Sequence, residues 1–257
     1  MTQTERLIYL IKYLLDENNR INQIDIPADN TQKKRLLRSL MNIRPPRAAS
    51  KDFLEIQDTY LQKECSKKGV IPLSDIPLAQ PGIYLWQGDI TRLSTDAIVN
   101  AANNTMLGCF IPCHGCIDNA IHSAAGIELR LECSHIMEEQ KTEEPVGKAK
   151  ITKAYNLSCN HVIHTVGPII YRAVTERDCG LLSNCYRSCL ELAAAYQLKS
   201  IAFCCISTGE FHFPNEKAAR IAVQTVKDYQ KRNQNGLEVV FNVFKDRDYE
   251  IYKQLLE

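Results

Sequence analysis

The chain has 257 residues and a formal net charge of +1, because its 31 Lys and Arg residues nearly balance its 30 Asp and Glu residues. So small a charge excludes binding to nucleic acid by bulk electrostatic attraction and leaves room only for a local basic patch. The hydrophobic content of 45 % and the charged content of 24 % are typical of a folded globular chain and too apolar for a disordered one.

Neither a membrane anchor nor a disulfide framework is expected. The longest apolar runs, such as residues 201–206, are far shorter than the roughly 20 residues that a membrane-spanning helix needs. The N-terminal apolar stretch has acidic residues on both sides and no small-residue cleavage site, so we expect a cytoplasmic protein without a secretory signal. The eleven cysteines are an odd number and, in that compartment, do not predict disulfides. Their spacing is therefore more informative than their number.

The first part of the chain predicts a small helical extension. Apolar residues recur at helical spacing in three stretches, residues 4–17, 31–43 and 51–67. The pair Pro45-Pro46 ends the second of these helices. In the first helix, Leu7, Leu10 and Leu14 form an apolar stripe, and we expect this stripe to dock the extension against the rest of the protein.

The boundary between the two parts falls near residue 75. Residues 71–82 hold three prolines and show little periodicity, which predicts a linker or a packed crossing segment. We therefore assign residues 1–75 to the helical extension and residues 76–257 to a second domain.

From residue 82 onward, short β-branched runs alternate with helical patterns. Strands are predicted over residues 83–87, 97–100, 150–154, 162–166, 201–205 and 237–243. Helices are predicted over residues 117–125, 129–140, 178–196, 216–230 and 249–256. This alternation indicates a three-layer α/β domain with a largely parallel or mixed central sheet. Because ligands of such domains bind beyond the carboxyl ends of the strands, the loops after strands are the candidate sites.

Two polar motifs follow or end predicted strands. Gly88-Asp89-Ile90-Thr91 comes directly after the strand at 83–87, although Asp89 could also do no more than cap a turn. The next strand ends in Val99-Asn100-Ala101-Ala102-Asn103. Its small residues would let a ligand approach the backbone closely, and the Asn103 side chain can both donate and accept hydrogen bonds.

A cysteine and histidine motif predicts a zinc site. Cys109, His114 and Cys116 form a C-x4-H-x-C pattern in a loop that also contains glycine and proline. Thiolate and imidazole are the ligands that zinc prefers, and three of them leave a fourth position open for water or substrate, as in catalytic zinc sites. Cys113 could instead supply a fourth ligand and close a structural site, and the spacing alone leaves this alternative open.

A second candidate loop follows the strand at 201–205. Ser207, Thr208 and Gly209 form a turn whose backbone amides could hold a diphosphate. Phe211 and Phe213 are equally consistent with core positions and with an aromatic ring that closes over a ligand. The remaining candidates are interpreted as structural residues, and these are His122, His164, Cys185, Cys189, Cys204 and Cys205.

Taken in order, the blocks GDIT, VNAAN, GCFIPCHGCIDNAIH and STG resemble the macrodomain family, whose members bind ADP-ribose. The cysteine and histidine insertion looks like the zinc-dependent subclass of bacteria and fungi, in which a helical N-terminal extension is also usual. The resemblance covers about residues 83–257. It implies a three-layer macrodomain with a mixed central sheet and one Zn²⁺ ion per chain.

The resemblance also implies roles for individual residues. Asp89 and Ile90 would contact the adenine base, and Asn103 would face the distal ribose. Ile117, Asp118 and Asn119 lie at a helix start, where free amides can face a phosphate. Asp118 would also act as a general base or orient water, so that Asp118 and Asn103 are the candidate catalytic residues. The contacts to diphosphate and ribose would come from Ser207, Thr208, Gly209, Glu210 and Phe211.

The function implied by the resemblance is removal of mono-ADP-ribose from modified aspartate or glutamate side chains of a protein, with release of ADP-ribose. A sirtuin-type transferase and a lipoyl-carrier protein related to the glycine-cleavage H protein are the implied source and bearer of the modification. Two alternatives use the same pocket, namely a non-catalytic ADP-ribose reader with a structural zinc and a deacylase of O-acyl-ADP-ribose. We expect a monomer that binds neither nucleic acid nor membrane.

Overall fold

The computed structural model describes residues 1–18 and 24–257, and its centre is a seven-stranded mixed sheet of order β2-β3-β9-β8-β5-β7-β6. The central strands β3, β9, β8, β5 and β7 run parallel, whereas β2 and β6 are antiparallel edge strands. The strand bounds are β2 Leu78–Gln80, β3 Ile83–Gln87, β5 Ala97–Ala102, β6 Ala149–Lys153, β7 His161–Val166, β8 Ser200–Phe203 and β9 Glu238–Val243.

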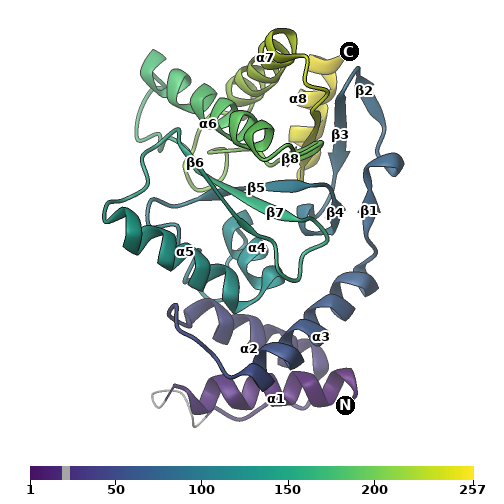
Figure 1. The fold of residues 1–257 in the computed structure, drawn as a ribbon, viewed down its shortest axis with the longest axis vertical. Helices are drawn as coiled ribbons and strands as arrows, with labels where there is room; N and C mark the ends of the chain where they lie inside the picture. Colours follow the sequence, from purple (N-terminus) through teal and green to yellow (C-terminus); the bar gives the residue numbers. More distant parts are fainter. Residues whose placement is uncertain (19–23) are drawn as a thin grey trace.

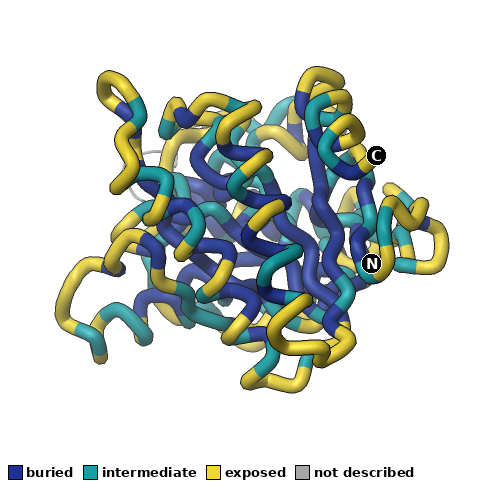
Figure 2. Tube along the Cα trace, turned by 90° about the horizontal axis from the view of Figure 1, so that it is seen from above, coloured by how far each residue is buried: buried dark blue, intermediate teal, exposed yellow. Residues whose placement is uncertain are grey.

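The central strands are continuous apolar runs because helices cover both faces of the sheet. Val99, Ile201 and Val239 are fully buried, and Figure 2 shows the buried strands running through the middle of the molecule. Helices α4 (Ile117–Ala125) and α5 (Ile127–Gln140) lie on one side of the sheet in Figure 1. The other side carries α6 (Glu176–Ala195), α7 (Asn215–Asn233) and α8 (Asp246–Leu256). The three-layer α/β architecture expected from the sequence is therefore confirmed.

The N-terminal extension has a hydrophobic core of its own. It consists of α1 (Gln3–Asp16), α2 (Asn30–Ile43) and α3 (Lys51–Lys68). Leu7, Leu10 and Leu14 are at most 3 % exposed and pack in one cluster with residues of α2 and α3. Ile127, at the start of α5, is the one residue of the second domain in this cluster among the described residues. The stripe therefore packs mainly within the extension, contrary to the expectation that it docks the extension against the second domain. An apolar stripe identifies the buried face of a helix but not the element that covers it.

Helices α2 and α3 make the contacts with the second domain, and both lie against α4. Polar bonds across this boundary are numerous and short. The Gln57 side chain accepts a hydrogen bond from the Ile127 amide at 2.9 Å, and the Asn156 amide donates to Asp58 at 2.7 Å. In Figure 1 the extension forms a further layer beyond α4 and α5, with α1 farthest from the sheet.

The segment expected to be a linker contains short strands. β1 (Ile71–Pro72) pairs in parallel with β4 (Leu93–Ser94), and β2 pairs with β3. The prolines in this segment are compatible with strands at a sheet edge, where an N–H group need not be paired. Two single-turn helices, η1 (Leu73–Asp75) and η2 (Ile90–Arg92), complete the connections. The boundary after residue 75 stays a prediction.

Within the described ranges, no helix is both long enough and apolar enough to cross a membrane. All eleven cysteines are free thiols.

Arg130 of α5 provides the first testable prediction. Its side chain donates to the carbonyl oxygens of Met41, Asn42 and Arg44 at 2.5–3.1 Å and to that of Leu107 at 2.7 Å. Burial lowers the pKa of Arg130 only to about 10, so the guanidinium stays charged at neutral pH. Replacing Arg130 by Met would leave buried carbonyls without a donor.

We expect Arg130→Met to lower the free energy of unfolding by roughly 2–3 kcal/mol, measured by urea denaturation. The control is Arg187→Met, which removes an exposed arginine of α6 that bonds only within its own helix and should change the stability by less than about 0.5 kcal/mol. Equal stability of the two variants would contradict the role given to Arg130.

Candidate active site

The parallel strands β3, β5, β8 and β9 end at one edge of the sheet, and a cavity of about 950 Å³ opens between that edge and the extension. This volume is near the upper end of the range of roughly 300–1,000 Å³ that is usual for small-molecule sites. The residues expected from the sequence line this cavity with one exception, Asn119. They are Asp89, Ile90, Asn103, Cys109, His114, Cys116, Ile117, Asp118, Ser207, Thr208, Gly209, Glu210 and Phe211.

Asp89 follows β3 and has two functions in the structure. One carboxylate oxygen accepts hydrogen bonds from the Thr91 amide at 3.1 Å and the Thr91 hydroxyl at 2.6 Å, and so caps η2. The other carboxylate oxygen lies 3.3 Å from the Lys68 ammonium of α3. Burial alone would raise the pKa of Asp89, but the Thr91 hydrogen bonds and the Lys68 charge outweigh it and hold the pKa below its ordinary value. Asp89 is therefore an ionised hydrogen-bond acceptor in the wall of the cavity.

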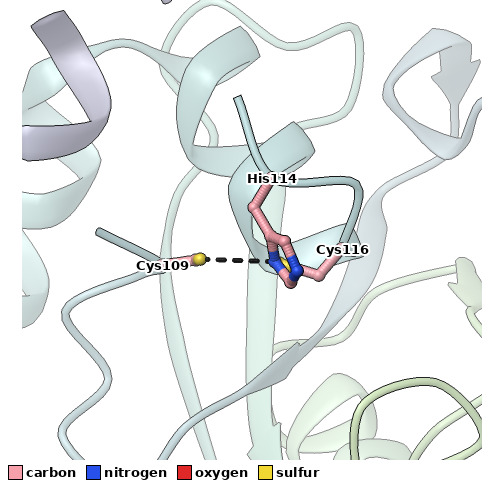
Figure 3. Close-up of side chains that lie close together, drawn as sticks. All are labelled: Cys109, His114 and Cys116. Atoms are coloured by element: carbon pink, nitrogen blue, oxygen red, sulfur yellow. Dashed lines mark hydrogen bonds between the residues drawn. The ribbon is translucent and has the colours of Figure 1, made fainter. Parts of the chain in front are cut away.

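The loop between β5 and α4 brings together the three residues of the C-x4-H-x-C motif (Figure 3). The ligand atoms of Cys109, His114 and Cys116 lie within 4.8 Å of one another, and Cys109 Sγ is 3.6 Å from His114 Nδ1. The loop depends on glycine at position 108. Gly108 has a φ of +77°, and a Cβ there would approach the ring of His122 to 2.8 Å.

Cys113 points away from this group. Its Sγ atom lies 3.3 Å from the Ser39 hydroxyl and 3.3 Å from the Arg35 carbonyl oxygen, both on α2. The alternative in which Cys113 closes a four-ligand site is therefore contradicted, and the three-ligand group remains.

The donor set fits a zinc ion in its chemistry. A group of two sulfurs and an imidazole nitrogen binds zinc in preference to magnesium or calcium. Burial raises the pKa of the Cys116 thiol to about 12, and the neighbouring Cys109 adds to this rise. Two thiolates at this place therefore require a compensating cation. The Glu210 carboxylate lies 3.7 Å from His114 Nε2, whereas His114 Nδ1 is the ring nitrogen that lies near Cys109 Sγ.

Asp118 is held by a buried network behind the metal-ligand group. Cys116 is the N-cap of α4, and Asp118 stands in the first turn of that helix. The Asn100 amide donates to Asp118 Oδ1 at 2.8 Å, and His122 Nε2 lies 3.4 Å from the same oxygen. Asn100 also lies 3.2 Å from His164 Nδ1. Burial raises the pKa of Asp118 to about 6, against the Asn100 hydrogen bond and the Arg130 charge, which lower it.

Two buried histidines, His122 and His164, lie beside this network. His122, Cys133 and His164 form a second group of possible ligand atoms, all of them buried. His164 Nε2 is 2.9 Å from the Thr152 hydroxyl, so a structural hydrogen bond occupies it. Burial lowers the pKa of both His122 and His164, which keeps both rings neutral. The position of His164 agrees with its structural interpretation. Both ring nitrogens of His122 are buried without a hydrogen-bond partner among the described residues, so the structural interpretation of His122 stays a prediction.

The loop after β8 presents unused donors to the cavity. Ser207 has a φ of +65°, and its hydroxyl is buried without a hydrogen-bond partner among the described residues. In the same described part of the chain, no group accepts a hydrogen bond from the backbone amides of Gly209, Glu210 and Phe211. Successive free amides of this kind form an anion-binding nest. Gly167 lies against Ser207, because a Cβ there would be 2.0 Å from the serine hydroxyl.

The two asparagines differ in their surroundings, and only Asn119 lies outside the cavity lining. Asn103 lines the cavity, but its side chain also bonds within its own loop, to Gly108 at 3.1 Å and to the Thr105 hydroxyl at 2.6 Å. Asn119 is fully buried, and its side chain faces Arg38 of α2 and the Ile111 carbonyl. The sequence suggested that Asn119 contacts the ligand. These contacts instead favour a structural role, in which Asn119 holds the loop in place.

Sequence reasoning missed the wall that the extension supplies. Lys34, Arg38, Tyr60, Leu61, Cys65 and Lys68 of α2 and α3 line the cavity. It also missed Phe244, which directly follows β9. Phe244 lines the cavity together with Gly88 and Asp89, and it is 75 % exposed. An aromatic residue directly after a strand was the available signal for Phe244. The extension carries no equivalent motif, because its cavity residues are ordinary helix-surface types.

Comparison with known proteins identifies the family of this chain. The Macro domain family profile matches residues 99–222. A protein-ADP-ribose hydrolase of Treponema medium is 55% identical, and the alignment covers 100% of both chains. A protein-ADP-ribose hydrolase of Staphylococcus aureus (strain COL) is 47% identical over 97% of this chain and 94% of its own. The solved structure of the Trypanosoma brucei macrodomain in complex with ADP-ribose is 30% identical, with a TM-score of 0.68, over 85% of this chain and 95% of that chain. Identity at this level over the whole length shows that the chain belongs to the macrodomain family.

Proposed function

We propose that this protein is a zinc-dependent hydrolase that removes mono-ADP-ribose from aspartate or glutamate side chains of a modified protein and releases ADP-ribose. The observation that carries the proposal is the meeting of three features in one cavity, namely the metal-ligand group, the buried carboxylate of Asp118 and the loop with free amides after β8. The two relatives named as protein-ADP-ribose hydrolases, at 55% and 47% identity, support the same activity.

ADP-ribose would lie along the edge of the sheet. The Asp89 carboxylate and the Ile90 amide suit the amino group and ring of adenine, with the exposed Phe244 ring as a stacking surface. The amides of residues 209–211 and the start of α4 suit the diphosphate. Asn103, between the two loops, would then contact the hydroxyls of the distal ribose.

The bond to be broken joins the anomeric carbon of the distal ribose to a carboxylate oxygen. Because a carboxylate leaves easily, the protein needs mainly a fixed ribose and a positioned water. Asp118 would orient this water and accept its proton, since its carboxylate lines the cavity and is held by Asn100. A zinc ion on Cys109, His114 and Cys116 would supply a Lewis acid next to this position.

The substrate is then a protein that carries mono-ADP-ribose, and the partner reaction is the transferase that attaches it. By family resemblance we propose a sirtuin-type transferase as that enzyme and a lipoyl-carrier protein as the bearer. The reader and deacylase alternatives predict the same affinity for ADP-ribose. They differ in turnover, because a reader releases nothing and a deacylase prefers the small ester to the modified protein.

Asp118→Asn tests the catalytic assignment. The substitution keeps the size of the side chain and removes the proton acceptor, so we expect kcat for release of ADP-ribose from a glutamate-modified protein to fall about 100-fold or more. Binding of ADP-ribose, measured by calorimetry, should change less than about 10-fold.

Asp228→Asn on α7 is the matched control, because this carboxylate bonds only to Gln224 of its own helix. Full turnover by Asp118→Asn would refute the assignment. Absence of turnover by the wild type, with ADP-ribose bound, would favour the reader.

Metal content tests the ligand set. We expect one zinc per chain in the wild type by mass spectrometry of the metal, and less than about a tenth of this in Cys109→Ala and Cys116→Ala. Cys113→Ala should retain the metal, because its thiol faces α2 instead of the ligand group. Loss of zinc in Cys113→Ala, or a wild-type content far from one, would contradict the three-ligand site.

A further inference from the structure

Helix α2 of the extension lies directly against the loop that carries the metal-ligand group. This loop, residues 103–116, joins β5 to α4, and none of its residues lies in a helix or a strand. An irregular loop of this length pays a large entropy cost to hold three side chains together unless other elements fix it.

Arg38 is the principal contact. Its Nη2 atom donates to the carbonyl oxygen of His114 at 2.9 Å. Its Nε and Nη2 atoms both donate to Asn119 Oδ1, at 3.0 and 2.7 Å. One guanidinium from the extension thus joins a metal ligand's own backbone to the first turn of α4.

Asn119 passes this constraint to the second sulfur ligand. Its backbone amide donates to Cys116 Sγ at 3.4 Å, and its side-chain amide donates to the Ile111 carbonyl at 3.0 Å. Because the side chain is fully buried, no water competes for these bonds. Arg38 therefore acts on His114 directly and on Cys116 through one intermediate residue.

Two further residues of α2 fix the middle of the loop. Asn42, which is 1 % exposed, accepts a hydrogen bond from the Cys113 amide at 2.9 Å and donates to Ser123 of α4 at 3.0 Å. The Ser39 hydroxyl meets the Cys113 thiol. The loop is thus tied to α2 at Cys113 and His114, through the side chains of Arg38, Ser39 and Asn42.

We propose that α2 is part of the metal centre and that Arg38 is a positioning residue, which holds His114 and Cys116 in place so that the extension controls retention of zinc. This inference rests on the zinc site of the proposed function. Residues that orient metal ligands through hydrogen bonds typically change metal affinity by 10- to 100-fold when they are replaced, and Arg38 has the geometry of such a residue.

Zinc release from the full-length, zinc-loaded protein to a chromogenic chelator tests the proposal. We expect Arg38→Ala to release zinc at least about 10-fold faster than the wild type. The rate of zinc release from Arg38→Lys should lie between those of the wild type and Arg38→Ala. The lysine ammonium keeps the charge but cannot bond to His114 and Asn119 in the forked geometry of a guanidinium. Arg6→Ala is the control. Among the described residues, the side chain of this arginine hydrogen-bonds only to Gln3 within α1, so the variant should release zinc at the wild-type rate.

Hydrogen exchange separates a loosened loop from a protein that has lost its fold. In zinc-loaded Arg38→Ala we expect faster exchange in residues 108–116 and unchanged exchange in β5 and β9. Arg38 also lines the cavity, so a contact with the ligand alone would lower ADP-ribose affinity without changing zinc release.

Lower ADP-ribose affinity with unchanged zinc release would overturn the proposal. Faster hydrogen exchange throughout the sheet would also overturn it. A zinc-loaded, active wild type with unchanged release in Arg38→Ala contradicts only this inference. A wild type that binds no zinc contradicts the proposed metal site as well.

Discussion

Two sulfurs and an imidazole can share one cation only if an irregular stretch of backbone holds them close together. Regular secondary structure does not supply that order, because residues 103–116 form none. The order comes from neighbours on several sides, with α2 on one, Arg130 of α5 on another, and the left-handed backbone at Gly108. Cys116 is at once a metal-ligand candidate and the N-cap of α4. The position of Asp118 therefore follows from the position of the loop.

The near-zero net charge agrees with the kind of recognition that the site provides. In the proposed binding mode, backbone amides after β8 and at the start of α4 would face the anionic ligand, and such dipoles need no excess of basic residues. Two of the cations nearby have specific partners. Lys68 lies against Asp89, and Arg38 is bonded to Asn119 and the His114 carbonyl. A protein that binds one small anion in this way can remain almost neutral.

The second domain was predictable because its strands and helices alternate with clear hydrophobic patterns, and the ends of β3 and α4 fall where those patterns end. The C-x4-H-x-C spacing likewise identified the ligand group, since the three residues are close in sequence. The element that covers the apolar face of α1 at Leu7 was not predictable, because the apolar pattern of a helix does not show which element packs against it. The contact of Arg38 with His114 was not predictable either, because 76 residues separate the two in sequence. The role of Asn119 was not predictable because its position at the start of a helix allows both a ligand contact and a structural contact.

The dependence of turnover on bound metal tests the central claim most directly. ADP-ribose release from a glutamate-modified protein should be measured together with zinc content, first as purified, then after chelation, and again after zinc is restored. We expect turnover to fall with the bound zinc and to return in proportion to it, while the far-ultraviolet circular dichroism stays unchanged. Full turnover by folded protein without zinc would contradict it.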